Sequence, residues 1–364
     1  MIKVLIADDS ALMRKMLKQI LESDPEIQVV GAARDGEDVV IKAREYRPDV
    51  VTMDVNMPKQ DGITALQYIV NEEICPVLMV SSLTQEGAMT TFEALELGAF
   101  DFVGKPGGTV SSSSDMKKVA AEIINKIRAA AQLKNRVVKR ERLARGQRQP
   151  VVKKKAPPRP GREVTKAVAM GISTGGPKMI YEVVPLIPPD INAALFLVQH
   201  MPPNFTPAYV KRLNEACQIE VIEARAGIKV EPGVLYVGSG GRHLNLVKNT
   251  AGDVIIRLSS KPDHLFIPSV SVMMESVLKV FSNRTIGVLM TGMGNDGADS
   301  MVNIRQAGGI TIAESEESAI VFGMPGDAIK RGGAEIVVPI WNIAREIIRA
   351  VNRKNYFKIG GGTG

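Results

Sequence analysis

Short apolar runs alternate with segments of helical apolar spacing along the first third of the chain. The segments between the runs repeat apolar residues every three or four positions, as at Leu12, Met16 and Ile20, which is typical of an amphipathic helix. Repeated strand–helix units of this kind predict an α/β domain with a doubly wound parallel sheet. The predicted strands are Lys3–Ala7, Gln28–Ala32, Asp49–Met53, Pro76–Val80 and Phe100–Val103.

The same alternation returns from about Ala167 to Asn352 and predicts a second α/β domain. We expect three layers with a mainly parallel sheet, and the hairpin-like spacing between Val234 and Leu258 predicts an antiparallel stretch there. The predicted strands are Val168–Gly171, Ala194–Gln199, Ile219–Ile222, Val234–Val237, Val254–Leu258, Thr285–Met290 and Gly309–Ala313. The predicted helices are Met179–Leu186, Pro207–Ala216, Val270–Phe281, Ala298–Gln306 and Trp341–Val351.

Between the two predicted domains the apolar periodicity fades and the composition becomes basic. A helical pattern from Met116 continues to about Arg145 while its apolar stripe thins, so this helix is expected to overrun its sheet. Residues 146–162 then mix Pro with Lys and Arg and show no core periodicity, which indicates a linker. The predicted organisation is a first domain at 1–133, a basic linker at 134–166, a second domain at 167–352 and a tail at 353–364.

Length and composition fit two globular domains. A chain of 364 residues with 45% hydrophobic residues is long for one core and can bury two. No apolar stretch reaches the length of a membrane span, and the first residues turn acidic too early for a secretory signal. Cys75 and Cys217 lack metal-ligand spacing and are interpreted as reduced core residues. We therefore expect a cytoplasmic protein without membrane insertion.

The net charge of +7 is concentrated in one segment. Residues 134–166 carry thirteen Lys and Arg against two Glu, so the rest of the chain has a surplus of negative charge. The run Lys153–Lys155 could touch an acidic partner, a membrane surface or nucleic acid, but a solvated, self-repelling linker is the simpler interpretation. The charge therefore gives little support to nucleic-acid binding by either domain.

Polar side chains follow the predicted strands of the first domain. Asp8 and Asp9 come after the first strand, Asp54 ends the third, Ser81 ends the fourth and Lys105 follows the fifth. Carboxyl ends of parallel strands meet at one edge of a sheet, where open α/β folds place their sites. Three converging carboxylates suit Mg²⁺, and a lysine with a hydroxyl beside them suits an incoming phosphoryl group.

These residues resemble a response-regulator receiver domain, and the matching motifs spread over the whole first domain. The resemblance implies that Asp54 is the phosphoacceptor, with Asp8, Asp9 and the backbone carbonyl of Asn56 at Mg²⁺. It also implies that Ser81 and Lys105 contact the phosphoryl oxygens. Phe102 stands where the family keeps an aromatic switch residue, although plain packing explains a buried aromatic equally well. The motifs are ADDS at Ala7–Ser10, MDVNMPKQDG at Met53–Gly62, VSS at Val80–Ser82 and GKP at Gly104–Pro106.

Three loops of the second domain each follow a strong predicted strand. The first, in AVAMGISTGGP, presents Ser173 before a helix N-terminus, where developing negative charge is stabilised. The others present His200 and Asp296, and the three together are the parts of an activated serine. His243 and His264 are rival bases, but each lies in a sequence typical of a turn. A glycine-rich turn can also hold a phosphate, so each residue alone has a simpler explanation.

Two other functions for the second domain remain open at this point. A nucleotide site could use the turn around Gly175, but the segment lacks the Gly-Lys-Ser/Thr ending of a P-loop. A DNA-binding output would explain the basic linker, but no helix-turn-helix unit is visible. The chain order Ser, His, Asp also differs from that of ordinary α/β-hydrolases.

The motifs GISTGGP, VQHMPPNF and TGMGNDGA together resemble the catalytic domain of chemotaxis receptor protein-glutamate methylesterases. The resemblance implies hydrolysis of glutamate γ-methyl esters on methyl-accepting receptors, with deamidation of receptor glutamines in many members. Ser173 would be the nucleophile, His200 the base and Asp296 its orienter, with an oxyanion hole near Thr174 and Met293. A chemotaxis histidine kinase would be the phosphodonor, and no cofactor is expected for the ester chemistry. The unphosphorylated receiver is expected to cover the sheet edge that holds the nucleophile.

Overall fold

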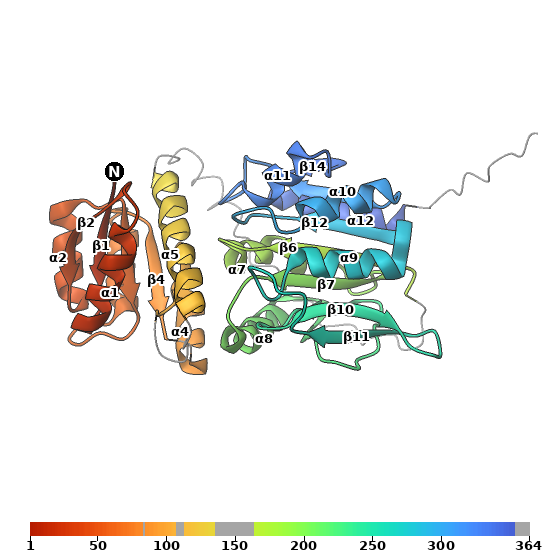
Figure 1. Ribbon diagram of the computed structural model, residues 1–364, viewed down its shortest axis with the longest axis horizontal. Coiled ribbons are helices and arrows are strands. Elements are labelled where there is room, and N and C mark those ends of the chain that lie inside the picture. Colours follow the sequence, from red (N-terminus) through yellow and green to blue (C-terminus); the bar gives the residue numbers. More distant parts are fainter. Residues whose placement is uncertain (83, 107–112, 135–163, 354–364) are drawn as a thin grey trace, which may run out of the picture.

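The computed structural model describes residues 1–82, 84–106, 113–134 and 164–353, which form two α/β domains (Figure 1). The predicted linker, the predicted overrun of the helix beyond Lys134 and the predicted tail from 354 onward lie outside the described residues, apart from a few residues at their edges. Among the described helices, none combines the length and apolar character that crossing a bilayer requires.

The N-terminal domain contains a five-stranded parallel sheet in the order β2-β1-β3-β4-β5. This confirms the predicted doubly wound sheet, because the chain winds to both sides of β1. The strands are β1 Ile2–Ala7, β2 Ile27–Ala33, β3 Val50–Asp54, β4 Val77–Ser81 and β5 Asp101–Gly104. The helices are α1 Ala11–Glu22, α2 Gly36–Tyr46, α3 Gly62–Asn71, α4 Gln85–Glu96 and α5 Ser113–Lys134.

The helices of the N-terminal domain begin at residues that the sequence supplies for that purpose. Ser10, Asp35, Asp61 and Thr84 each accept a hydrogen bond from the backbone N–H three residues later. Such caps satisfy N–H groups that have no partner inside the helix. Because the caps determine where each helix starts, they also determine the length of the short loops between the strand ends and the helices, where acidic residues lie.

The C-terminal domain has a seven-stranded sheet in the order β14-β13-β12-β6-β7-β9-β8, parallel throughout, and a separate antiparallel pair, β10 with β11. Helices cover both faces, so the predicted three-layer architecture is confirmed. The strands are β6 Lys166–Ile172, β7 Ala193–Gln199, β8 Glu220–Glu223, β9 Val234–Val237, β10 His243–Lys248, β11 Val254–Ser259, β12 Thr285–Leu289, β13 Ile310–Glu314 and β14 Ile336–Val338.

The α-helices of this domain lie on the two faces of the large sheet (Figure 1). Apolar residues of α9, α10 and α11 pack in one core, and those of α8 and α12 pack in the other. The helices are α7 Gly176–Met179, α8 Thr206–Ala216, α9 Val270–Phe281, α10 Ala298–Gln306, α11 Met324–Lys330 and α12 Ile340–Asn352. Short 3₁₀ turns occur at η2 Ile180–Glu182, η3 Val184–Leu186, η4 Pro203–Phe205 and η5 Ser282–Arg284.

The structure corrects two sequence predictions. The helix expected at Met179–Leu186 is replaced by α7 and two 3₁₀ turns, because Pro185 has no backbone N–H to donate to the carbonyl of Tyr181, as a continuous α-helix requires. The antiparallel stretch predicted between Val234 and Leu258 is present as β10 with β11, but it does not include Val234–Val237, because β9 is parallel to both of its neighbours. The antiparallel partner of β11 is β10, a strand that the apolar pattern did not indicate.

Candidate active site

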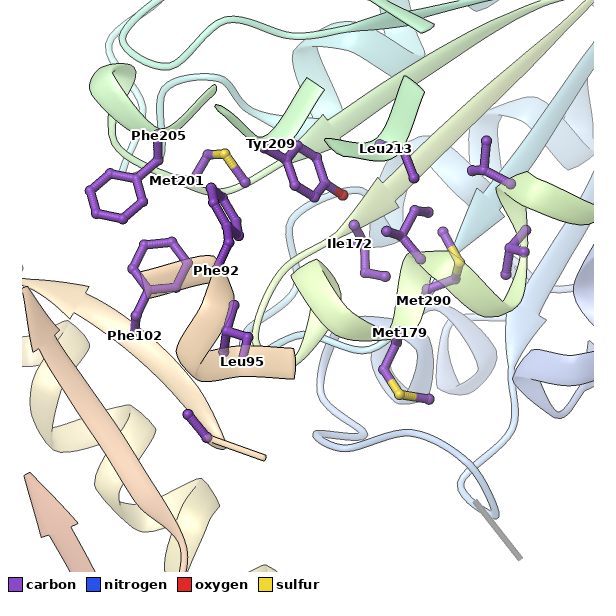
Figure 2. Close-up of a cluster of buried hydrophobic side chains, with 14 of the residues drawn as sticks. Phe92, Leu95, Phe102, Ile172, Met179, Met201, Phe205, Tyr209, Leu213 and Met290 are labelled. Atoms are coloured by element: carbon purple, nitrogen blue, oxygen red, sulfur yellow. The ribbon is translucent and has the colours of Figure 1, made fainter. Parts of the chain in front are cut away.

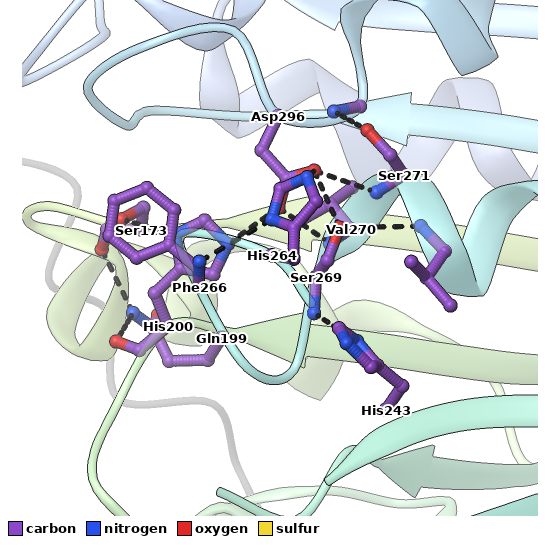
Figure 3. Close-up of polar contacts among 12 residues, drawn as sticks. Ser173, Gln199, His200, His243, His264, Phe266, Ser269, Val270, Ser271 and Asp296 are labelled. Atoms are coloured by element: carbon purple, nitrogen blue, oxygen red, sulfur yellow. Dashed lines mark hydrogen bonds and ion pairs between the residues drawn. The ribbon is translucent and has the colours of Figure 1, made fainter. Parts of the chain in front are cut away.

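Three neighbouring strands of the large sheet present the candidate catalytic side chains. Ser173 follows β6, His200 follows β7, and Asp296 lies in the loop after β12. The sheet order places β6 between β12 and β7 with all three strands parallel. Their carboxyl ends therefore meet at one edge, and the three side chains converge there although 123 positions separate the first from the last along the chain (Figure 3).

The imidazole of His200 bridges the other two groups. Its Nδ1 lies 3.0 Å from the Oγ of Ser173, and its Nε2 lies 2.9 Å from the Oδ2 of Asp296. With the ring proton on Nε2, donated to the carboxylate, the lone pair of Nδ1 faces the serine hydroxyl and can take its proton. The arrangement has the geometry of a general base held by an acid, and all three side chains are largely buried.

Asp296 is fixed at the N-terminus of α9. Its Oδ1 accepts from the hydroxyl of Ser269 at 2.8 Å and the N–H of Ser271 at 2.9 Å, and its Oδ2 accepts from the N–H of Val270 at 2.7 Å. Burial would raise the pKa of Asp296, but the hydrogen bonds from His200 and Ser271 outweigh it and hold the pKa well below its usual range. The carboxylate therefore stays ionised and can stabilise an imidazolium.

The sequence pattern did not reveal how Asp296 is held. A serine before the apolar run at Val270 is a helix-cap signal, and Ser269 does accept from the N–H of Val272. Phe266 was also missed: its ring stacks on the imidazole of His200 with centroids 4.2 Å apart (Figure 3). No local signal connects this aromatic with the base, because they are far apart in the chain and meet only in the fold.

The rival histidines have other partners. His243 is buried at the start of β10, where Nε2 bonds the carbonyl of Pro262 and Nδ1 accepts from Ser269. The predicted turn is present at Gly240–Arg242, but His243 itself is not part of it, because β10 begins at this residue. His264 has its Nε2 3.9 Å from Oδ1 of Asp296, whereas His200 bonds Oδ2. Of the three histidines, it is His200 that contacts Ser173.

The loop that carries Ser173, residues 173–176, is held by contacts to its backbone. The N–H of Ser173 donates to the carbonyl of Thr291 at 2.9 Å, and the side chain of Gln199 donates to the carbonyl of Ser173 at 3.0 Å. Gly175 has a φ of +75°, in the left-handed region that glycine adopts without strain. At Gly176 a Cβ atom would come within 2.2 Å of the side chain of Gln199, so the loop needs glycine there as well.

Of the two residues predicted near an oxyanion, Thr174 belongs to the loop of Ser173 and Met293 to the loop after β12. Thr174 is buried directly after the serine, and its carbonyl accepts from the hydroxyl of Thr291 at 2.9 Å. Met293 lies in the loop after β12, two residues beyond Thr291, and its side chain packs against apolar residues of the N-terminal domain. The positions fit the predicted role, which remains a prediction.

A second polar cluster lies at the carboxyl edge of the N-terminal sheet. Asp8, Asp9 and Asp54 each offer an oxygen within 4.8 Å of the others, the spacing of a cation site. Nζ of Lys105 lies 2.9 Å from Asp8 and 2.7 Å from Asp54, and Ser81 is buried at the end of β4. Burial raises the pKa of Asp54 despite the lysine beside it. Asn56 is exposed two residues after Asp54.

The two domains share an aromatic cluster beside the candidate active site (Figure 2). Phe102 of β5 stacks on Phe205 with centroids 4.6 Å apart, and Phe92 of α4 stacks on Tyr209 at 5.9 Å. Phe205 belongs to η4, which directly continues the loop of His200. Phe102, singled out from its position in the sequence, is thus buried between its own domain and the segment that carries the candidate base.

A buried ion pair of the N-terminal domain also touches the loop that carries Ser173. Oδ2 of Asp101 accepts from the N–H of Gly175 at 3.1 Å and lies 3.4 Å from Nζ of Lys126. Burial raises the pKa of Asp101, whereas the charge of Lys126 lowers it. At the edge of the interface, Arg212 of α8 donates to Glu96 of α4 at 2.8 Å. Contacts from the first domain therefore reach within two residues of Ser173.

Comparison with known proteins finds relatives of both domains. The family model described as CheB methylesterase matches residues 168–347, and the response regulator receiver domain matches residues 4–111. Relatives named protein-glutamate methylesterase/protein-glutamine glutaminase include one from Caldanaerobacter subterraneus subsp. tengcongensis, 48% identical over 96% of this chain and 97% of its own. One from Pyrococcus horikoshii is 46% identical over 96% of this chain and 94% of its own.

Solved structures resemble each domain separately. The CheB methylesterase catalytic domain of Thermotoga maritima has 35% sequence identity and a TM-score of 0.49, covering 50% of this chain and 97% of that one. The response regulator domain of Thermotoga maritima CheB has 51% identity and a TM-score of 0.33, covering 36% of this chain and 96% of that one.

Proposed function

The chain belongs to the family of protein-glutamate methylesterases/protein-glutamine glutaminases, with a receiver domain before the esterase domain, and from this premise we propose that Ser173, His200 and Asp296 are its catalytic triad. It is a chemotaxis enzyme regulated by its receiver. The observation that carries the proposed triad is the pair of hydrogen bonds made by His200, one to the serine and one to the buried carboxylate. The family assignment does not favour the alternative of a DNA-binding output.

The geometry supports a two-step hydrolysis of a glutamate γ-methyl ester. The proton of Ser173 passes to Nδ1 of His200 as Oγ bonds to the ester carbonyl carbon. Nδ1 then returns the proton to the methoxide as the carbon–oxygen bond breaks, and methanol leaves. Water repeats the sequence, deprotonated by His200, and releases the glutamate carboxylate and the free serine. With a glutamine amide the leaving group is ammonia, and the other steps are the same.

Charge that develops on the substrate needs donors near the nucleophile. We propose that backbone N–H groups near Thr174 and Met293 supply them, because Thr174 follows Ser173 directly and Thr291, two residues before Met293, is hydrogen-bonded to both Ser173 and Thr174. Asp296 stabilises the imidazolium, since its pKa is held low enough for it to remain charged. A single oxyanion donor typically contributes about 3–4 kcal/mol to the transition state.

We propose that Asp54 is phosphorylated with Mg²⁺ held by Asp8, Asp9, Asp54 and the carbonyl of Asn56. The three carboxylates fit a hard cation because their oxygens converge within 4.8 Å. When bound, Mg²⁺ neutralises charge on the transferred phosphoryl group. We propose that Lys105, which is paired with Asp54, and Ser81, which ends β4, contact the phosphoryl oxygens.

The contacts between the domains support control of the triad by the receiver. In this structure the receiver packs on the loops of Ser173 and His200, and the carboxylate of Asp101 accepts a hydrogen bond from the N–H of Gly175. We propose that this is the unphosphorylated, closed form, and that phosphorylation of Asp54 shifts the population toward an open one. The proposed substrates are methyl-accepting receptors, the proposed phosphodonor is a chemotaxis histidine kinase, and the proposed place of action is the cytoplasm.

Methanol release from methylated receptor membranes tests this assignment. A small phosphodonor with Mg²⁺ should raise the rate about tenfold, within the usual range for coupling between sites. The variant Asp54→Ala should lose this stimulation because it has no carboxylate to accept the phosphoryl group. Asp61→Ala serves as a control, since Asp61 caps α3 and lies outside the acidic cluster. Equal stimulation of the Asp54→Ala protein would rule out Asp54 as the phosphoacceptor.

Charge reversal at the domain interface tests the closed form. Arg212→Glu should raise methanol release without phosphodonor about two- to fivefold, because it turns an ion pair worth at most ~1 kcal/mol into a repulsion with Glu96. The double variant Arg212→Glu with Glu96→Arg restores the pair with reversed polarity and should return the rate to that of the parent. If both proteins keep the parent rate, this edge of the interface does not restrain the enzyme.

A further inference from the structure

Glu314 is a fully buried acid that the proposed reaction does not use. It ends β13, the strand next to β12 on the side away from β6. Its Oε2 accepts from the backbone N–H of Thr291 at 2.7 Å, and its Oε1 accepts from the hydroxyl of Ser318 at 2.7 Å. Burial raises the pKa of Glu314 to about 7. A carboxyl group is costly to bury, so its two donors must compensate for the water it loses.

Thr291 connects this carboxyl group to the nucleophile loop. Its carbonyl accepts from the N–H of Ser173 at 2.9 Å, and its hydroxyl donates to the carbonyl of Thr174 at 2.9 Å. The same hydroxyl accepts from the N–H of Val321 at 3.0 Å. The polar groups of Thr291 thus hold three segments together, and its N–H is committed to Glu314.

The position of Thr291 also determines where the loop with the proposed oxyanion donor, Met293, begins. Met293 follows two residues later, and Gly292 between them donates to the carbonyl of Val321 at 3.0 Å. The carbonyl of Gly292 accepts from Met324 at 2.8 Å. A shift of Thr291 would therefore move the nucleophile and the oxyanion loop relative to each other.

We propose that Glu314, acting through Thr291, is a positioning residue that aligns Ser173 with the oxyanion loop. Glu314 does not touch the substrate, and its effect is on the distance between the attacking oxygen and the N–H groups that stabilise the oxyanion. Such distances must be kept within about half an ångström for full activity. This inference rests on the proposed function, because it assumes that Ser173 is the nucleophile.

The test compares two replacements of Glu314 in the full chain, stimulated by phosphodonor and supplied with methylated receptor membranes. Glu314→Leu removes the acceptor of the Thr291 N–H and should lower kcat for methanol release about 10- to 100-fold, with KM changed by less than about twofold. Glu314→Gln keeps a carbonyl oxygen for that N–H and an amide for Ser318, and it should keep kcat within about threefold of the parent. Loss of kcat at constant KM, rescued by Gln, is the signature of positioning.

Ser318→Ala provides the matched control. Ser318 bonds the other oxygen of Glu314 and accepts from the N–H of Ile340, so its loss should lower the thermal midpoint and leave kcat within about twofold. Should Glu314→Leu not fold, Thr291→Val takes its place: it keeps the N–H and removes the hydroxyl link to Thr174, and it should lower kcat about tenfold.

Three results would overturn the inference. The first is that a folded Glu314→Leu protein, or the Thr291→Val protein used in its place, releases methanol with the kcat of the parent. The second is that Glu314→Gln loses as much kcat as Glu314→Leu. The third is that Ser318→Ala loses kcat to the same extent as Glu314→Leu. If the parent itself released no methanol under any condition, the proposed function would be the part that fails, and the variants would not be needed to show it.

Discussion

Replacing Ser173 with alanine should lower methanol release about 10⁴-fold or more, with or without phosphodonor. The hydroxyl of Ser173 is the only group placed 3.0 Å from Nδ1 of His200 among the described residues, so its loss leaves the base without a proton to take. Serine enzymes that lose a member of the triad keep only the catalysis that binding and the oxyanion hole provide. The alanine itself fits the space, because it removes one oxygen from a buried position.

The measurement is methanol release from methylated receptor membranes over hours, long enough to detect a residual rate. Labelling by a fluorophosphonate, which reacts with activated serines, should mark the parent and not the variant. Ser239→Ala is the control: Ser239 follows β9 and donates to Glu223, and its loss should keep the rate within about twofold. A Ser173→Ala protein that hydrolyses esters at the parent rate would mean that the nucleophile lies elsewhere.

Asp296→Asn should lower the rate about 10³- to 10⁴-fold while the fold is retained. An amide group turned toward His200 donates to Nε2, which moves the ring proton to Nδ1 and points it at Ser173. In the opposite orientation the NH₂ of the asparagine faces the N–H of Ser271, and two donors cannot form a hydrogen bond with each other. Either orientation leaves one backbone N–H at the start of α9 without an acceptor, so some stability is lost as well.

Rates of methanol release and of fluorophosphonate labelling should fall together in this variant, because both depend on removal of the serine proton. Asp299→Asn is the matched control, since Asp299 lies three residues away on α10 and forms an exposed pair with Arg331. Its rate should equal that of the parent within about twofold. Normal labelling of the Asp296→Asn protein would show that the carboxylate does not set the tautomer of His200.

Much of the candidate site could be predicted because it depends on strand order alone. Ser173, His200 and Asp296 each follow an apolar run that reads as a strand, and parallel strands bring their ends to one edge whatever the details of packing. The acidic cluster around Asp54 was predictable for the same reason. The fold class followed from the alternation of strands and helices, and the structure confirms it in both domains.

The supporting contacts could not be predicted, because they join segments with no local relation. Nothing near Glu314 in the sequence indicates that its carboxyl group meets Thr291, in the loop after the neighbouring strand β12. The bonds of Asp296 to the start of α9 depend on how that helix packs over the sheet. His243 was placed in a turn because glycines precede it, although β10 begins there and its ring is buried. Local composition gives no measure of such tertiary packing.

The stacking of Phe102 on Phe205 joins the domain of Asp54 to the segment that carries His200. Under the proposed mechanism, the phosphoryl group on Asp54 and the receptor on the triad both favour molecules in which this stack is broken. Linkage then requires that each increase the affinity of the protein for the other by the same factor. Receptor-bound molecules therefore hold their phosphoryl groups in preference to free ones, so that the enzyme pool in a cell is activated most where its substrate is concentrated.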